Sequence, residues 1–215
     1  MVIIERYISK LMFSNMYVVK ESGHALIIDP HERFDMMDDI TPDLILLTHE
    51  HYDHISGVNA WKERYHIPVL CSSACAMALE NNKQNMAHYF VAFSEMQTYG
   101  VQDPDVPIDD QYTCHGDLTF DDTVELHWQG HKMRLFSLPG HSKGSIGIMI
   151  DESFLFSGDS LLPDRKVELR FPGGSRKLWE SISVQRLKAL SEDLTVYPGH
   201  RDVFVLKDRE NNGDI

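Results

Sequence analysis

A continuous apolar run that stops abruptly in a block of histidines and acids constrains this chain more than any other feature. Residues 43–47 read DLILL, which is short enough for a buried strand, and the block that follows reads THEHYDH. If the backbone stays extended through the first part of this block, His49 and His51 point to the same side. If a helix begins near Asp53, its turn of about 100° per residue swings Asp53 and His54 toward a neighbouring point. The block therefore predicts ligands for two metal ions.

Further ligands must come from elsewhere in the chain, because a protein metal site takes three or four protein ligands. Three candidates share one setting: each follows an apolar run, and each is preceded by a glycine that allows a sharp turn. They are His141 in LPGHS, Asp159 in FSGDS and His200 in YPGHR. Taken singly, each could be a capping or loop residue. Their occurrence together with the first block favours a metal site, and we expect the remaining histidines to have ordinary structural roles.

Strand and helix patterns place these polar blocks in a layered α/β fold. The strand-like runs fall at 16–19, 25–28, 43–47, 68–70, 123–128, 132–138, 145–150, 153–157 and 194–197, and the helix-like patterns fall at 55–65, 72–80 and 177–190. The first two runs flank the polar turn ESGH and predict a hairpin, and the runs between 123 and 157 predict an antiparallel meander. Residues 81–117 predict a long loop with a single helical turn. Because the polar blocks directly follow apolar runs, we expect their loops to meet at one edge of the sheets.

The composition of the 215-residue chain describes one soluble domain over residues 1–215. Its 20 Lys and Arg against 33 Asp and Glu give a formal charge of −13, which offers no surface for nucleic acid or an anionic membrane. No stretch of eighteen apolar residues occurs, and Glu5, Arg6 and Lys10 interrupt the N-terminal region where a signal peptide needs an apolar run. Three cysteines are too few, and an odd number, for a secreted disulfide framework. We therefore expect a cytoplasmic protein with no nucleic-acid or membrane partner, and the oligomeric state stays open.

In their combination and order, the motifs of this chain resemble those of the metallo-β-lactamase superfamily, in particular its glyoxalase II-like hydrolases. The motifs that carry the resemblance are SNMYVV, ALIIDP, LTHEHYDHISG, LPGHSKGSIG, FLFSGDSL, FPGGS and YPGH. The resemblance implies a four-layer αβ/βα sandwich with a metal centre at the strand edge. It also implies a ligand set for each ion: His49, His51 and His141 for the first, Asp53, His54 and His200 for the second, and Asp159 as the bridge between them.

The bridging aspartate also narrows the choice within the superfamily. True β-lactamases of this superfamily lack it, so Asp159 favours the glyoxalase-like branch. The sequence departs from that branch where KVELR precedes FPGGS and where Arg201 follows His200, a position at which glycine is common. It also ends soon after His200, without the helical extension with which glyoxalase II enzymes hold glutathione. The resemblance therefore does not identify the thiol half of the substrate.

The activity implied is hydrolysis of a thioester or related acyl ester, a small-molecule substrate. Two divalent ions would share a water, lower its pKa toward about 7 and provide a bridging hydroxide. Zn²⁺ is the first expectation, with Fe or Mn as alternatives. Asp53 is the candidate catalytic residue that would orient this nucleophile and pass on its proton. Asp29 and Thr48 either support the ligands from behind or act as capping residues.

Substrate specificity is expected to come from the loop at 81–117 and from the segment 161–175 beyond Asp159. Lys166 and Arg170 either meet an acidic group of the substrate or are ordinary exposed basic residues. The aromatic residues of the long loop either wall an apolar pocket or pack the loop down; they are Tyr89, Phe90, Phe93 and Tyr99.

Two other functions remain open at this stage. One is a persulfide dioxygenase with a single iron, held by ligands that include His49, His51 and Asp159. The other is a metal-bound effector-binding protein with little turnover.

Overall fold

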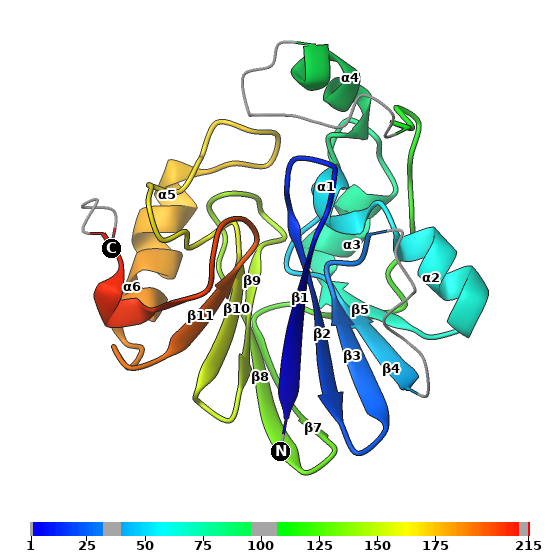
Figure 1. Cartoon of the computed structure of the whole chain (residues 1–215). Helices are drawn as coiled ribbons and strands as arrows, with labels where there is room; N and C mark the ends of the chain where they lie inside the picture. Colours follow the sequence, from blue (N-terminus) through cyan, green and yellow to red (C-terminus); the bar gives the residue numbers. More distant parts are fainter. Residues whose placement is uncertain (1, 32–39, 96–106, 211–214) are drawn as a thin grey trace.

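The computed structural model describes residues 2–31, 40–95, 107–210 and 215, and it packs two six-stranded sheets face to face (Figure 1). The first sheet has the order β1-β2-β3-β4-β5-β6, with β1 Ile3–Ile8, β2 Asn15–Glu21, β3 His24–Ile28, β4 Thr41–Leu46, β5 Val69–Ser72 and β6 Leu118–Phe120. The second has the order β12-β11-β10-β9-β8-β7, with β7 Thr123–Trp128, β8 His131–Ser137, β9 Ile146–Ile150, β10 Phe154–Gly158, β11 Thr195–Pro198 and β12 Phe204–Val205.

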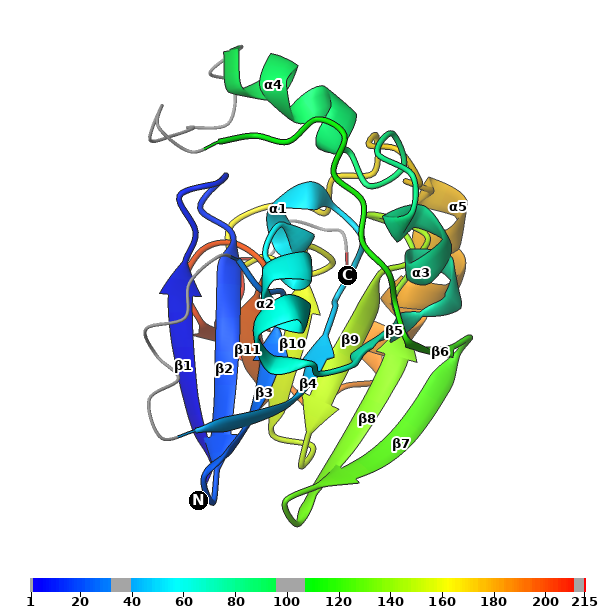
Figure 2. The ribbon, with the colours of Figure 1, turned by 90° about the vertical axis from the view of Figure 1, so that its right-hand side faces the viewer.

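Helices cover the outer face of each sheet (Figure 1; Figure 2). Those on the first sheet are α1 Tyr52–Ile55, α2 Val58–Tyr65 and α3 Ser73–Leu79, and α4 Ala87–Glu95 lies beyond them at the end of the sandwich. Those on the second sheet are α5 Arg176–Leu178, the π-helical segment Trp179–Ser183 and α6 Val184–Lys188; a 3₁₀ turn at Leu206–Asp208 follows β12. The four-layer αβ/βα sandwich implied by the resemblance is confirmed.

Strand residues of the first sheet alternate between two cores, which is why its strands read as continuous apolar runs. In β2, Met16 and Val18 pack in the cluster beneath the helices, whereas Tyr17 and Val19 pack in the cluster between the sheets. Successive side chains of a strand point to opposite faces, so a strand covered on both sides needs apolar residues at every position. The same rule explains the run that leads from β4 into the histidine block.

Most of the elements predicted from the sequence are present. The hairpin pairs β2 with β3 in antiparallel register, and β7 to β10 form the predicted antiparallel meander. The helix predicted over 55–65 is divided at Gly57, where a Cβ would lie 2.4 Å from the carbonyl carbon of His31. The helix predicted over 177–190 is divided by the π-helical segment.

The prediction of a single helical turn within 81–117 was wrong, because α4 extends over nine residues. Met86, Ala87 and Phe90 are all at most 4% exposed and join the cluster beneath the helices. This tertiary burial stabilises a helix whose local sequence gives a weak signal. No helix in the described part of the chain is long and apolar enough to cross a membrane.

Candidate metal centre

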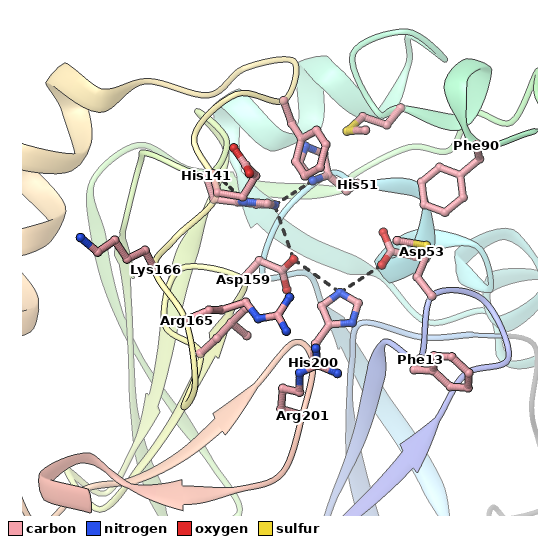
Figure 3. A pocket seen from close by; sticks show the side chains of 15 residues that line it. Phe13, His51, Asp53, Phe90, His141, Asp159, Arg165, Lys166, His200 and Arg201 are labelled. Carbon is pink, nitrogen blue, oxygen red and sulfur yellow. Dashed lines mark hydrogen bonds and ion pairs between the residues drawn. The ribbon is translucent and has the colours of Figure 1, made fainter. Parts of the chain in front are cut away.

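All seven predicted ligands lie together at one end of the sandwich, on four loops that follow strands. The block after β4 carries four of them, the loop between β8 and β9 carries His141, and Asp159 and His200 directly follow β10 and the end of β11. Figure 3 shows side chains from all four loops facing one another across a pocket. Their assignment as ligands rests on the geometry and chemistry that follow.

The first group of donors consists of His49, His51 and His141, whose candidate ligand atoms lie within 4.8 Å of one another. His141 donates through Nδ1 to the carbonyl oxygen of Glu168 at 2.8 Å, which leaves a lone pair on Nε2. That Nε2 lies 2.9 Å from Nδ1 of His51. Nε2 of His49 is buried and has no hydrogen-bond partner among the described residues. Buried polar atoms are rarely left unpaired, so an ion that accepts these lone pairs fits the group.

The second group consists of Asp53, His54 and His200, and its dimensions match an ion-binding site. Nε2 of His54 lies 3.3 Å from Nε2 of His200, and Oδ2 of Asp53 lies 3.4 Å and 3.3 Å from these two nitrogens. Two ligands held about 2.0–2.1 Å from a tetrahedral ion lie roughly 3.3–3.4 Å apart. The three atoms therefore already have the spacing that a bound ion requires.

Asp159 lies between the two groups, as the resemblance implies. Its Oδ2 is 3.6 Å from Nε2 of His141 in the first group and 3.4 Å from Nε2 of His200 in the second. Its Oδ1 is 3.5 Å from Nε2 of His54 and makes no hydrogen bond in the described structure. A carboxylate with one oxygen directed toward both groups has the geometry of a bridging ligand.

Glycines allow these groups to approach so closely. Gly158 has φ +50°, a conformation that side chains disfavour, and a Cβ there would lie 2.5 Å from Oγ1 of Thr48. A Cβ on Gly199 would lie 2.3 Å from Oδ1 of Asp159. At both positions the absent side chain lets one ligand loop pack directly on another.

Behind the ligands, Asp29 fixes the orientation of one histidine from each group. Its carboxylate accepts hydrogen bonds from the backbone nitrogen of Thr48 at 2.7 Å, from Oγ1 of Thr48 at 2.5 Å and from Nδ1 of His54 at 3.1 Å. Because the Thr48 hydroxyl gives its only proton to Asp29, it accepts from Nδ1 of His49, 3.1 Å away. In its neutral form, each imidazole therefore carries its proton on Nδ1 and offers Nε2 to an ion.

Candidate ligand atoms of a third group, Asp29, His49 and His54, also lie within 4.8 Å of one another. Their close atoms are already joined by the hydrogen bonds just described, so this third group is a supporting network. It confirms the contact of Asp29 and Thr48 with the candidate ligands.

The first group is neutral in the metal-free protein. Burial lowers the pKa of His49 and His141, and it lowers that of His51 to about 3; the neighbouring imidazoles add to the effect at His49 and His51. Their nitrogens are lone-pair donors at neutral pH and bind a cation without first losing a proton.

The second group is charged in the metal-free protein. Burial opposes protonation of His54, but the carboxylates of Asp53 and Asp159 outweigh it and raise its pKa to about 8. The pKa of His200 is raised well above its usual value because the nearby carboxylates, Asp159 foremost, overcome burial in the same way. In return, the imidazoles hold the pKa of Asp159 well below its usual range despite burial. Cations are therefore favoured between these two carboxylates.

A pocket of about 200 Å³ opens above both groups, and its lining includes His51, Asp53, His141, Asp159 and His200. The remaining lining residues are Met12, Phe13, Met86, Phe90, Leu162, Arg165, Lys166, Glu168, Phe171 and Arg201.

Of the predicted substrate contacts, Lys166 lines this pocket, whereas Arg170 is absent from the lining. The Arg170 side chain is 84% exposed and bonds to both carboxylate oxygens of Glu168, at 2.8 Å and 2.6 Å. Phe90 lines the pocket and Tyr89 does not. The Phe93 side chain and Tyr99 lie outside the described residues.

Two guanidinium groups in the lining, those of Arg165 and Arg201, were missed as candidates. Arg201 had one available signal, since it directly follows a predicted ligand at a position where glycine is common. Arg165 lies in the segment 161–175, from which substrate specificity was expected, but no pattern in the sequence distinguishes it from its neighbours.

Comparisons with known proteins agree with the fold described above. A hydroxyacylglutathione hydrolase of Aeromonas salmonicida is 26% identical over 196 residues, which cover 86% of this chain and 60% of the relative, so this chain spans about three fifths of that protein. The crystal structure of the BLEG-1 B3 metallo-beta-lactamase matches with a TM-score of 0.77 at 26% identity, over 96% of this chain and 95% of that one. TTHA1623 in a di-iron-bound form has the same fold, with a TM-score of 0.72 at 22% identity and coverage of 98% and 100%. The family model of the metallo-beta-lactamase superfamily matches residues 10–200, and this chain belongs to that superfamily.

Proposed function

We propose that this chain is a dinuclear metal-dependent hydrolase that acts on a thioester or a related acyl ester. The observation that carries the proposal is the pair of adjacent donor groups with Asp159 between them, at the floor of a pocket. The distant relationship to hydroxyacylglutathione hydrolases supports an acyl thioester as the substrate class.

The residues present fit two divalent ions. The donors are nitrogen and oxygen atoms only. In the described structure, Nε2 of His49 and of His51 in the first group and Oδ1 of Asp159 are buried without a hydrogen-bond partner, so an ion would satisfy atoms that are otherwise unpaired. Zn²⁺ suits this donor set, and Fe or Mn suit it as well. When bound, two such ions act as a Lewis acid toward the acyl carbonyl and lower the pKa of water toward about 7.

The protein's own side chains position the reactants. The Asp53 carboxylate lines the pocket and is 8% exposed; burial opposes its ionisation, but His54 and His200 lower its pKa, so it is charged at neutral pH. It can accept a hydrogen bond from the attacking water and hold that water's lone pair toward the acyl carbon. Oxygen adds to this carbon, the C–S bond breaks with its electron pair on sulfur, and the thiolate takes up the proton released by water.

Apolar side chains shield the reacting groups from solvent. Phe171 lies with its ring 5.9–6.0 Å from the imidazoles of His51 and His141, and Phe90 and Met86 join it in the lining. They provide a surface for the acyl chain and limit access of bulk water. The substrate is therefore expected to be a small acyl compound.

The cytoplasmic location of the protein remains a prediction from the sequence.

The test measures metal content and turnover together. Protein purified under anaerobic conditions and loaded separately with Zn²⁺, Fe²⁺ or Mn²⁺ is assayed against acyl thioesters, acyl esters, a chromogenic β-lactam and a persulfide with oxygen. We expect two equivalents of metal and release of thiol from at least one thioester. Oxygen uptake by a one-iron form would overturn the proposal in favour of a dioxygenase, and full metal occupancy without turnover of any substrate would favour an effector-binding protein.

Replacing the bridge tests the dinuclear assignment. Asp159→Ala is expected to lose both ions and all activity, because each donor group loses a ligand. Asp193→Ala is the matched control, since Asp193 is an exposed carboxylate that pairs with Lys207 and does not line the pocket. Full metal occupancy and rate in Asp159→Ala would refute the bridge.

A further inference from the structure

The pocket above the candidate metal centre has two chemically different walls. Figure 3 shows Arg165, Lys166 and Arg201 on one side and Phe13 and Phe90 on the other. Three cations in the lining of one pocket are notable in a chain whose formal charge is −13. We call the three residues Arg165, Lys166 and Arg201 the cationic wall.

Arg201 is held in a backbone conformation that favours glycine. Its φ is +77°, and its carbonyl oxygen accepts hydrogen bonds from Nη1 of Arg6 at 2.6 Å and from Nδ2 of Asn15 at 2.8 Å. These two bonds come from the first sheet and fix the turn that follows His200. A glycine would adopt this φ without strain, whereas an arginine here strains the backbone at a cost in free energy. Such strain at a site is a reason to look for a role of the side chain.

One carboxylate orients both guanidinium groups. Asp164 Oδ2 lies 3.2 Å from Nε of Arg201, and Asp164 Oδ1 lies 3.2 Å from Nε of Arg165. Within the described part of the chain, these contacts use only the Nε edge of each group, and the terminal nitrogens have no side-chain partner. Asp164 neutralises one of three positive charges. The wall therefore keeps donors and positive charge available to a ligand.

The cationic wall adjoins the second donor group, because Arg201 directly follows His200. When a thioester is hydrolysed, negative charge develops on the departing sulfur. Fixed cations beside the position where that charge develops favour the reaction more than cations placed elsewhere. The apolar side chains Phe13 and Phe90 lie across the pocket and suit an uncharged acyl chain.

Resting on the hydrolase function proposed above, we infer that the cationic wall binds an anionic group on the thiol half of the substrate. The group is a carboxylate or a phosphate, since paired guanidinium groups bind either one with two hydrogen bonds. Arg201 is the main specificity-determining residue, and Arg165 assists it. The acyl half is uncharged and lies against the apolar wall.

Two isomeric thioesters separate this inference from its alternatives. S-butanoyl-3-mercaptopropionate carries its carboxylate on the thiol half, and S-propyl thiosuccinate carries it on the acyl half; S-propyl thiobutanoate is neutral. We expect kcat/KM to be at least about tenfold higher for the first compound than for the other two, because one charge-assisted hydrogen bond contributes binding free energy equivalent to about that factor. S-butanoyl-2-mercaptoethyl phosphate replaces carboxylate by phosphate and shows which anion is preferred.

Arg201→Gly is the decisive variant. Glycine accepts φ +77° and keeps the carbonyl that Arg6 and Asn15 bind, so the unfolding temperature is expected not to fall. The preference for S-butanoyl-3-mercaptopropionate should disappear, because kcat/KM for this compound should fall about tenfold more than kcat/KM for the neutral thioester. Arg201→Lys should restore part of the preference, and the exposed Arg176→Ala should change nothing.

Equilibrium binding gives a readout that does not depend on turnover. The thioether 3-(butylthio)propanoate has the same carboxylate and no reactive carbonyl, and its Kd for the metal-loaded protein should rise about tenfold in Arg201→Gly. An unchanged Kd and an unchanged preference in Arg201→Gly would overturn the inference, as would a preference for S-propyl thiosuccinate. If no thioester is hydrolysed by fully metal-loaded protein, the proposed function fails instead, and the thioether still reports on the cationic wall.

Discussion

Asp29→Asn is expected to weaken metal binding at both donor groups although it preserves size and shape. Asparagine offers one acceptor oxygen and one donor nitrogen in place of two acceptors. If the oxygen keeps the bond from the Thr48 backbone nitrogen, the amide nitrogen faces Oγ1 of Thr48 and Nδ1 of His54. The hydroxyl then accepts from the amide and donates to Nδ1 of His49 instead.

This reversal moves the proton of each imidazole to the wrong nitrogen. His49 and His54 would both become protonated on Nε2, the atom that the structure directs at the candidate ions. Loss of an outer partner of a metal-binding histidine typically reduces metal affinity about 10- to 100-fold. At about 1.4 kcal/mol per factor of ten, we expect a loss of about 1.4–2.8 kcal/mol of binding free energy for each ion.

Competitive titration with a chromophoric zinc chelator measures both Kd values, and Asp43→Asn is the matched control. Asp43 accepts from Nδ1 of His24 at 2.9 Å and from Nε1 of Trp128 at 2.7 Å, at the opposite end of the β3 and β4 strands. The same chemical change there should lower the free energy of unfolding and leave both Kd values unaltered. Equal Kd values in Asp29→Asn and the unmodified protein would refute the assignment of Asp29 as the residue that orients the ligands.

Three further predictions concern stability and pH. Gly144→Ala should destabilise the protein by about 2–3 kcal/mol in urea unfolding, because its Cβ would lie 2.3 Å from Oε2 of Glu50 and 2.6 Å from Cα of Cys75; a loss below about 0.5 kcal/mol would contradict this packing. Metal binding at the second donor group should weaken as pH falls below about 8, by up to about tenfold per pH unit for each proton displaced from His54 and His200. Metal binding at the first donor group should change little between pH 6 and 8. Parallel pH profiles of the two Kd values would disprove this prediction. Chelation of bound metal should lower the free energy of unfolding by about 2.7 kcal/mol if the metal had been present at 100 times its Kd, and a melting temperature insensitive to chelator would argue against metal at this site.

The candidate ligands could be predicted from the sequence because their signals are local. Each of the seven directly follows an apolar run or lies within the block after β4, and the ends of strands in layered sheets gather at one edge. The same reasoning named Asp29 and Thr48 either as supports of the ligands or as capping residues. It could not supply the direction of proton donation through the Thr48 hydroxyl, which needs the distances.

The pocket walls could be predicted only in part: Lys166 and Phe90 line the pocket as expected, whereas the other wall residues depend on packing between segments without periodic patterns. Arg170 was a reasonable candidate as an exposed cation, but the Glu168 carboxylate two residues away captures its guanidinium. Lys166, on the same segment, keeps its place in the lining. The helix α4 forms because Phe90 and its neighbours are buried by the rest of the fold, which a local pattern does not record.

The overall charge of the chain makes the cationic wall testable by ionic strength. A net charge of −13 repels an anionic substrate at long range, whereas Arg201 attracts it at contact. Salt shortens the reach of both effects, since the Debye length falls from about 30 Å at 0.01 M to about 8 Å at 0.15 M. In Arg201→Gly the contact attraction is weakened, so salt should raise kcat/KM for S-butanoyl-3-mercaptopropionate more in the variant than in the unmodified protein. The kcat/KM of the unmodified protein divided by that of Arg201→Gly should therefore fall as the salt concentration rises. A constant ratio from 0.01 M to 0.15 M salt would mean that Arg201 acts on this substrate by shape alone.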